Sequence, residues 1–435
     1  MAYALGILIS LAAGFFLLRT LAVGGLNLIL YILLALTLGL GIDGTAGFYV
    51  HVLLNQFNRF IPVGIVILGG LLLSQKPPLR WQAFKDHIKF PPSYSWGLLI
   101  LALLALPLIS SGHYFPLGGW DAWSCWNLKA KFIFMGQEHW KDMLAPSLWR
   151  SNTQYPLLWP LINVWFWDLS GRFEQATPML NSIVIALLTA GVLLFGIWEL
   201  TGQLMAAILA AVIVTALPFN VNFYTSQYSD SLLGLYLLSA FVSWLLSEKY
   251  HQPNLKVLSM IFLGLMSFTK SEGEVAAVIA ALGLLWHQRT DNKKELKNLV
   301  LAFIIAALPT IIFTFFIAPK NEAFVNGLVS TQKPTTLGRV GIVLLSPWLE
   351  VLSPQWHGFW ILGLGGILLA GKKLWRATLG IMGLSLILYF GVVLAYYTVN
   401  TYFEIVWWLG QTLARILFAL MPTVVLWICC GLMDV

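Results

Sequence analysis

Charged side chains are scarce in this chain of 435 residues. Lys, Arg, Asp and Glu together make up 10% of it, whereas hydrophobic residues make up 59%. Ordinary soluble domains contain roughly a quarter charged residues. The shortage therefore predicts an integral membrane protein.

Cysteine is also scarce, and its placement argues against two kinds of site. Cys125, Cys429 and Cys430 are too few and too unevenly placed for a disulfide framework. No spacing of Cys and His suggests zinc. The net charge of +7 could indicate an anionic partner, but a basic excess in membrane proteins usually marks the cytoplasmic side. We expect a lipid bilayer, and no nucleic acid, as a partner.

Long apolar runs are what the sequence has instead. They reach the roughly 17 to 25 residues that cross a bilayer, and they must be helical because lipid offers the backbone no hydrogen-bond partner. We expect an all-α integral membrane protein with about thirteen spans. These are 3–18, 22–41, 57–73, 96–111, 175–198, 203–219, 229–247, 256–269, 273–287, 298–318, 355–371, 377–397 and 413–431. The first run is expected to be retained, since it lacks a basic start and a small-residue cleavage site.

Two shorter apolar stretches, 155–170 and 339–352, are interrupted by proline or charge, and we expect them to lie on the membrane surface. With the N-terminus outside, the cytoplasmic loops, including 74–95 and 288–297, carry fourteen Lys/Arg and six Asp/Glu. The outer side carries eleven Lys/Arg and twelve Asp/Glu. A span at 155–170 would reverse every later loop and put basic clusters outside. Residues 112–174 are therefore predicted to form a long outer loop.

The segment "GGWDAWSCWNLKAKFIF" is the polar centre of that loop. A helix over 120–134 would have an aromatic side and a polar side. The aromatic side would hold Trp123, Trp126, Ala130, Ile133 and Phe134. The polar side would hold Asp121, Cys125 and Lys129. We expect the aromatic side to rest in the interfacial belt and Asp121 to point away from lipid; an ordinary surface helix with a solvated acid is the alternative.

Further polar groups are expected on the same outer side. Tyr155 lies in "YPLLWP", which opens the predicted surface helix 155–170. Tyr228 and Asp230 stand in "QYSDSLLGLY" at the start of a span, where Asp230 could simply cap the helix. Lys270 and Glu272 lie in "TKSEG", a tight turn between two apolar runs. Ionisable groups so close to hydrocarbon are costly and indicate function.

The last polar pair belongs to "QTLAR". Gln411 and Arg415 are four residues apart, so they share a helix face at the outer end of the final span. Arg415 could simply extend its charged group to the membrane interface, or it could bind a phosphate.

In order and character these segments resemble the GT-C superfamily of membrane glycosyltransferases, which includes the protein O-mannosyltransferases and the lipid A aminoarabinose transferases. The resemblance covers residues 96–431 and rests on "GGWDAWSCWNLKAKFIF", "YPLLWPLINVWFWDLSG", "YSDSLLGLY" and "TKSEG". "WDA", "WNLKAKF" and "QTLAR" look most like the branch related to rhizobial lipopolysaccharide-core glycosyltransferases. Residues 1–95 are then three additional spans and a cytoplasmic loop. A single Asp121 replaces the usual acid pair, and Tyr155 stands where relatives often carry histidine.

The resemblance implies transfer of a sugar from a polyprenyl-phosphate donor to a hydroxyl of a lipid, glycan or protein. The reaction would occur on the extracytoplasmic side of a bacterial inner membrane, with inversion and with Asp121 as general base. Lys270, Arg415 and Lys320 are expected to bind the donor phosphate. Lys129, Tyr155, Tyr228, Asp230, Glu272 and Gln411 are expected to bind the rest of the substrates. The sequence leaves open whether carboxylates such as Asp121 and Asp230 bind a divalent cation.

Two other functions compete with this interpretation. A transporter or flippase for a lipid-linked sugar would need polar groups through the bilayer midplane and a path to the cytoplasm. The predicted spans are nearly free of charge at mid-depth, which favours the enzyme. A membrane scaffold without chemistry would explain the hydropathy but not the acid and the cations on the outer face.

Overall fold

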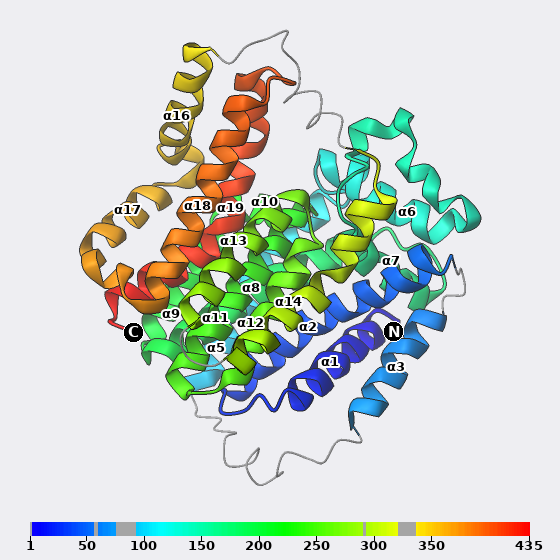
Figure 1. Cartoon of the computed structure of the whole chain (residues 1–435), viewed down its shortest axis with the longest axis horizontal. Helices are drawn as coiled ribbons and strands as arrows, with labels where there is room; N and C mark the ends of the chain where they lie inside the picture. Colours follow the sequence, from blue (N-terminus) through cyan, green and yellow to red (C-terminus); the bar gives the residue numbers. More distant parts are fainter. Residues whose placement is uncertain (1, 56–59, 75–92, 290–292, 321–335) are drawn as a thin grey trace.

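The computed structural model describes residues 2–55, 60–74, 93–289, 293–320 and 336–435, and their regular secondary structure is entirely helical (Figure 1). Nine helices in these residues are long and apolar enough to cross a membrane. They are Ala2–Thr20, Leu28–Leu53, Tyr94–Tyr114, Thr177–Thr201, Ser229–Tyr250, Lys293–Ile317, Leu337–Trp356, Ala377–Val399 and Ile405–Leu432. A bent pair, α9 (Leu204–Ala216) and α10 (Pro218–Thr225), would make a tenth if counted as one span. The expected all-α membrane protein is confirmed, but the count of thirteen is not.

Four of the predicted spans correspond to helices that are not among these nine. These are α3 (Phe60–Ser74), α12 (Pro253–Ser267), α13 (Ser271–Gln288) and α17 (Phe359–Ala370). The turn before Lys270 ends α12 early, and acidic residues occupy the first turn of α13. Most of the predicted cytoplasmic loop 74–95, the start of the predicted span 57–73 and part of loop 288–297 lie outside the described residues.

The N-terminal helices form a tight hairpin. α1 (Ala2–Thr20) packs against α2 (Leu28–Gly47), whose first turn is capped by Asn27. A Cβ atom on Gly14 would lie 1.8 Å from the Ala35 carbonyl oxygen, and one on Gly39 would lie 1.8 Å from the Ser10 carbonyl oxygen. Small residues are what allow such close backbone contact between membrane helices.

The second N-terminal span is longer than predicted and contains an acid. The predicted span ended at residue 41, but α2 continues to Gly47 and then as η1 (Phe48–Leu53). Asp43 therefore lies inside a candidate span, where it is fully buried and accepts a hydrogen bond from the Ser10 hydroxyl.

Helix α7 (Leu158–Ser170) is not among the candidate spans, as predicted for 155–170, but it is enclosed by protein and does not rest on the membrane surface. Every residue from Leu158 to Asp168 is buried, and the helix contacts α1, α2, α6 and α8. A helix that is apolar on all sides is expected to be enclosed. At 1.5 Å per residue it is also only about 20 Å long, too short to span.

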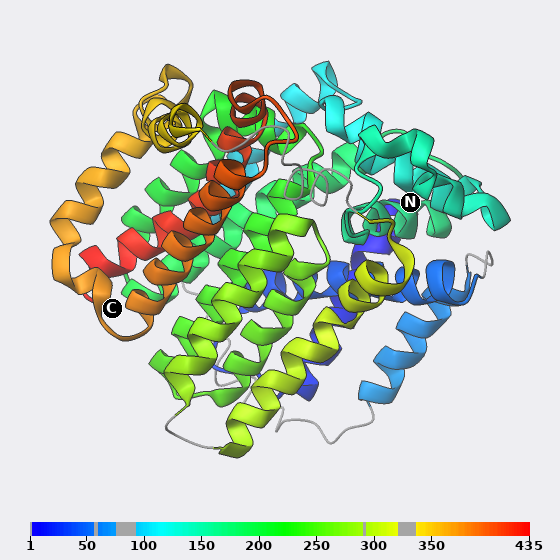
Figure 2. The same ribbon diagram turned by 45° about the horizontal axis from the view of Figure 1, so that its top comes forward.

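The other predicted surface stretch, 339–352, forms α16 (Leu337–Val351), most of whose residues are not buried. Continued through η6 (Pro354–Trp356), it is one of the nine helices long enough to cross. Figures 1 and 2 place α16 and α17 at one edge of the bundle and α1 and α3 at the opposite edge.

Helix α11 (Ser229–Tyr250) forms the centre of the bundle. All its residues from Ser229 to Ser247 are buried, and it packs against α8 (Thr177–Thr201), α12 and α19 (Ile405–Leu432). The remaining long helices are α5 (Ser93–Tyr114), α14 (Lys293–Ile312) with η5 (Phe313–Ile317), and α18 (Ala377–Val399), which follows η7 (Gly371–Trp375).

The loop after α5 is folded into short helices. They are η2 (Ala122–Trp126), α6 (Asn127–Met135), η3 (Gln137–Leu144) and η4 (Pro146–Ser151). Figure 1 shows α6 and its neighbours gathered beside α7, away from α16 and α17. This arrangement brings the loop to the end of the bundle where α11 begins.

Candidate functional site

Five charged side chains from distant parts of the chain meet where α11 begins. Asp121 directly precedes η2, Asp230 lies in the first turn of α11, and Arg415 lies in α19. Lys270 and Glu272 come from the junction of α12 and α13. We call these five residues the charge chain, because acids and bases alternate along it.

The Arg415 guanidinium bridges two carboxylates. Its Nη1 donates to Asp121 Oδ2 at 2.5 Å, while its Nη2 and Nε donate to Asp230 Oδ2 at 2.9 and 3.3 Å. The side chain of Asp230 is 3% exposed, whereas that of Asp121 is 24% exposed. Hydrogen bonds between ionised groups are about twice as strong as neutral ones. Asp121 was expected to act as a general base and Arg415 to bind the donor phosphate, but their pairing with each other was not predicted.

Lys270 continues the charge chain. Its Nζ lies 3.1 Å from Asp230 Oδ1 and 3.2 Å from Glu272 Oε1. Burial alone would lower the pKa of Lys270, but the negative charges of Asp230 and Glu272 outweigh it and raise the pKa above its usual value. Lys270 is therefore a cation, and Asp230 links two cations instead of serving only as a helix cap.

Two glycines allow Asp121 to reach the charge chain. Gly118 has a left-handed φ of +69°, which glycine adopts without strain. The Gly119 N–H donates to the Ser226 carbonyl oxygen at 3.0 Å, and a Cβ atom on Gly119 would lie 2.2 Å from the Tyr228 hydroxyl. The "GG" before Asp121 thus permits close contact with the loop that leads into α11.

Tyrosine rings cover both cations. The Arg415 guanidinium lies 4.4 Å from the centre of the Tyr228 ring, and Lys270 Nζ lies 5.8 Å from that of Tyr155. Both are cation–π distances. Burial raises the pKa of Tyr228, so it presents a neutral hydroxyl. The structure therefore places both predicted substrate-binding tyrosines against the charge chain.

Lys129 is fully buried, although it was expected on a polar helix face. Its Nζ donates to the backbone oxygens of Asn152 at 2.6 Å and Tyr155 at 3.3 Å. Burial lowers the pKa of Lys129. The position of Lys129 suits it to hold the segment 152–155 that carries Tyr155.

Most of the predicted surface helix 120–134 is enclosed by protein on both faces, whereas Trp123 of the aromatic face is 47% exposed. Trp126, Ala130 and Ile133 are buried in protein instead of resting in the interfacial belt, and Cys125 is buried as well. The reason is tertiary: α6 packs between α7 and η3, so its two sides both contact protein.

A row of buried polar side chains adjoins the charge chain and was missed in the sequence. Gln227 Nε2 donates to the Pro116 carbonyl oxygen at 2.9 Å, and Gln227 Oε1 accepts from Asn127 Nδ2 at 2.8 Å. The row continues through Asn163 and Asn181 to the Tyr3 hydroxyl of α1. We call Gln227, Asn127, Asn163, Asn181 and Tyr3 the amide row. Single asparagines in apolar runs were the available signal, because a buried amide requires partners.

Two other predicted residues are not joined to the charge chain. Gln411 lies one turn before Arg415, but its side chain is exposed, and no described residue is hydrogen-bonded to it. Lys320 is exposed at the end of the described segment 293–320. Neither is seen to contact the charge chain within the described parts of the molecule.

The carboxylates of the charge chain face protein cations. Among the described residues, no group of three or more His, Cys, Asp and Glu side chains is placed to hold a metal ion. Asp121, Asp230 and Glu272 instead share Arg415 and Lys270.

The charge chain can still bind an anion. In its bonds to described residues, Arg415 uses three of its five N–H groups, and Lys270 uses two of three. Arg415 is also in direct contact with Asp121, a partly exposed carboxylate. The site therefore combines a proton acceptor with fixed positive charge.

Comparisons with protein-family models, with curated proteins and with solved structures gave no match to this chain.

Proposed function

We propose that the protein is an extracytoplasmic membrane glycosyltransferase of the GT-C type, which moves a sugar from a polyprenyl-phosphate donor to an acceptor hydroxyl. The observation that carries the proposal is the Arg415 bridge between Asp121 and Asp230. It puts a candidate base in direct contact with a guanidinium, the group best suited to a phosphate. The order of the segments that contribute the charge chain, which resembles that superfamily, supports the same function.

Donor binding would release the base. A lipid phosphate that approaches Arg415 competes with Asp121 for Nη1, because both are anionic acceptors of the same N–H. While Asp121 accepts that hydrogen bond, the oxygen is not available to a proton. When Nη1 donates its hydrogen bond to the phosphate instead, Asp121 Oδ2 becomes free to accept a proton from the acceptor hydroxyl. The base is therefore active only when the donor is present.

The chemical step is a displacement at the anomeric carbon. The acceptor oxygen forms a bond to this carbon while the bond from the carbon to the phosphate oxygen breaks, and the electron pair leaves with the phosphate. The acceptor proton passes to Asp121 Oδ2. Arg415 and Lys270 stabilise the charge that develops on the phosphate, and Asp230 holds both cations in position. Attack from the side opposite the phosphate inverts the configuration.

The test uses purified protein in liposomes with sugar-labelled undecaprenyl-phosphate donors and membrane extract as the source of acceptors. Asp121→Asn keeps an oxygen for Arg415 but removes the base, so transfer should fall about 10² to 10⁴-fold while donor binding is retained. Asp142→Asn, which changes an exposed acid of the same loop, is the matched control. An undiminished transfer rate in the Asp121 variant would refute the assignment.

One observation favours a second candidate function, a flippase for lipid-linked sugars. Asp43 is an acid inside the Leu28–Leu53 span, as a transporter would require. The two functions are separated by undecaprenyl phosphate carrying a fluorescent label, reconstituted with the protein in liposomes. A flippase exposes label of the inner leaflet to an impermeant quencher, whereas a transferase leaves that fraction protected.

A further inference from the structure

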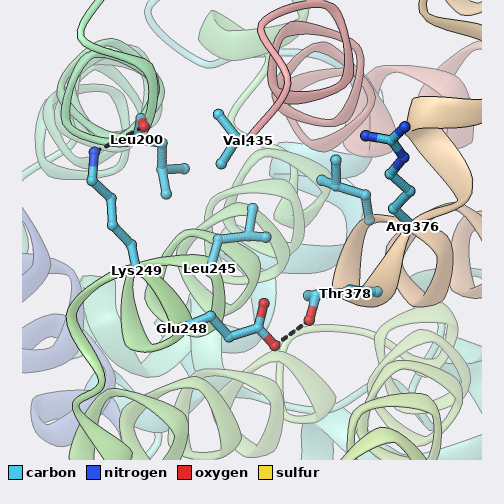
Figure 3. A pocket seen from close by; sticks show the side chains of 9 residues that line it. Leu200, Leu245, Glu248, Lys249, Arg376, Thr378 and Val435 are labelled. Carbon is cyan, nitrogen blue, oxygen red and sulfur yellow. Dashed lines mark hydrogen bonds between the residues drawn. The ribbon is translucent and has the colours of Figure 1, made fainter.

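A pocket lies at the end of α11 that is opposite to the charge chain (Figure 3). Asp230 stands in the first turn of α11 and Glu248 in its last, about 27 Å apart at 1.5 Å per residue. The pocket has a volume of about 340 Å³ and lies between the end of α8, the end of α11 and the start of α18. Its lining includes Leu200, Leu245, Glu248, Lys249, Arg376 and Thr378.

Glu248 presents an acceptor to this pocket. Its Oε1 accepts a hydrogen bond from the Thr378 hydroxyl and one from Trp244 Nε1 at 3.1 Å, and it lies 3.4 Å from His287 Nε2. All three contacts reach the same oxygen. The carboxylate is therefore held in place, and no described residue donates to Oε2.

Two cations flank the pocket on opposite sides (Figure 3). Lys249 Nζ donates to the backbone oxygens of Glu199 at 2.6 Å and Leu200 at 2.9 Å, which are neutral partners. Arg376 Nη1 donates to Asp434 at 3.0 Å, and its side chain is 67% exposed. Both cations retain N–H groups beyond these bonds. Leu200 and Leu245 supply apolar wall between them.

We propose that this pocket binds a phospholipid whose headgroup carries a phosphate and a primary ammonium, the phosphatidylethanolamine class. The ammonium donates to Glu248 Oε2, the phosphate lies between Lys249 and Arg376, and the glycerol end lies on the two leucines. A purely anionic headgroup would be repelled by the Glu248 carboxylate. A quaternary ammonium headgroup has no N–H to donate.

The position in the bundle agrees with a lipid of the inner leaflet. Glu248, Lys249 and Arg376 lie at the ends of candidate spans, the depth at which headgroups are found. Lys372, Lys373 and Arg376 form one of the basic clusters that the positive-inside rule assigns to the cytoplasm. Basic pockets between helices on that side are known to take lipid headgroups. The proposal is independent of glycosyl transfer.

The experiment is native mass spectrometry of the full chain released from nanodiscs that contain phosphatidylethanolamine, phosphatidylcholine or phosphatidylglycerol with the same acyl chains. We expect phosphatidylethanolamine to be retained about tenfold better, the ratio that one added ionic hydrogen bond of about 1.4 kcal/mol gives. Glu248→Gln should remove the preference over phosphatidylcholine. Equal retention of the three lipids by the unmodified protein would overturn the proposal.

Arg376→Gln provides a second variant that leaves the fold intact, because this side chain is largely exposed. It should lower retention of phosphatidylethanolamine about tenfold, whereas Lys372→Gln, outside the pocket, should not. Asp434→Asn removes the ion pair of Arg376 but keeps the cation, so retention should persist. Equal retention after Arg376→Gln would contradict the site. Binding of free phosphoethanolamine without lipid retention would overturn the lipid assignment.

Discussion

At the scale of single residues, Arg415 is the least replaceable member of the charge chain. One guanidinium satisfies Asp121 and Asp230 together through three N–H groups. A planar fork can do this, whereas an ammonium is a point charge on a flexible stem. Arg415 therefore ties the candidate base to the first turn of the central helix, next to the backbone hydrogen bond between Gly119 and Ser226.

We expect Arg415→Lys to keep the positive charge and lose the bridge. The lost ionic hydrogen bond is worth about 1.5 to 3 kcal/mol, so donor binding and transfer should fall about tenfold to a hundredfold. Binding of labelled undecaprenyl phosphate and transfer in liposomes are the measurements. Arg289→Lys is the control, because Arg289 lies at the end of α13 that is far from Lys270. It should change neither donor binding nor transfer. Unaltered donor binding in the Arg415 variant would remove it from the phosphate site.

The members of the charge chain could be predicted from the sequence, but their pairing could not. Costly charges next to apolar runs identified Lys270 and Glu272, and the composition of "GGWDAW" identified Asp121. Arg415 and Asp121 are 294 positions apart, and their contact depends on the packing of α19 against α11. No local pattern carries that information. Lys320 and Gln411 were predicted in the same site, yet in the described parts of the chain neither contacts the charge chain.

At the scale of elements, Gln227 joins three segments that hold the site. It binds Pro116 in the segment before Asp121, Asn127 at the start of α6 and, through its backbone oxygen, Trp159 of α7. Gln227 also has a positive φ of 60°, which few non-glycine residues adopt. Three sets of bonds hold it in this conformation. Gln227 is therefore a positioning residue for Asp121, not a catalytic one.

Replacement of Gln227 by leucine should loosen the loop without touching the substrate. Burial raises the pKa of the Cys125 thiol to about 11, so at pH 8 little thiolate is present and maleimide labelling is slow. In a background with alanine at positions 429 and 430, Gln227→Leu should lower this pKa toward its ordinary value and speed labelling at least about tenfold. The turnover number should fall more than donor affinity.

The control for this variant is Gln203→Leu, an exposed glutamine at the turn between α8 and α9. It should leave Cys125 labelling slow and transfer intact. If labelling of Cys125 in the Gln227 variant stays as slow as in its parent, the amide row does not hold the loop.

The boundaries of long helices were predictable, and the surroundings of short ones were not. Apolar runs gave α8, α11 and α18 within a few residues, because length and hydropathy decide whether a helix can span. The same property cannot separate a surface that faces lipid from one that faces protein. For that reason α7 was predicted on the membrane surface, although it is enclosed by other helices.

At the scale of the whole molecule, the N-terminal helices are part of the same packed body as the site. α2 contacts α7, α8 and α11, and Tyr3 of α1 ends the amide row. The hairpin depends on backbone contact at Gly14 and Gly39. The division at residue 95 drawn from the sequence stays a prediction, but α1 and α2 contact the helices that surround the site.

We expect Gly39→Ala to destabilise the whole protein. Its Cβ atom would lie 1.8 Å from the Ser10 carbonyl oxygen, so α1 and α2 must move apart. Such overpacking costs about 1 to 3 kcal/mol or more. Gly391→Ala in α18, whose added Cβ atom would meet no other described element within 4 Å, should instead be neutral or stabilising by up to about 1 kcal/mol. Thermal unfolding in detergent compares the two; equal melting temperatures would show that the hairpin contact is not tight.

The burial of Asp43 against Ser10 has a consequence for how the chain is made. An aspartate near the middle of a helix raises the free energy of insertion through the translocon by about 2.5 to 3.5 kcal/mol. Ser10 precedes Asp43 in the chain, so the helix that offers the hydrogen bond is synthesised first and is waiting when the acid arrives. We expect α1 and α2 to leave the translocon as a pair, with the first helix acting as an intramolecular chaperone for the second.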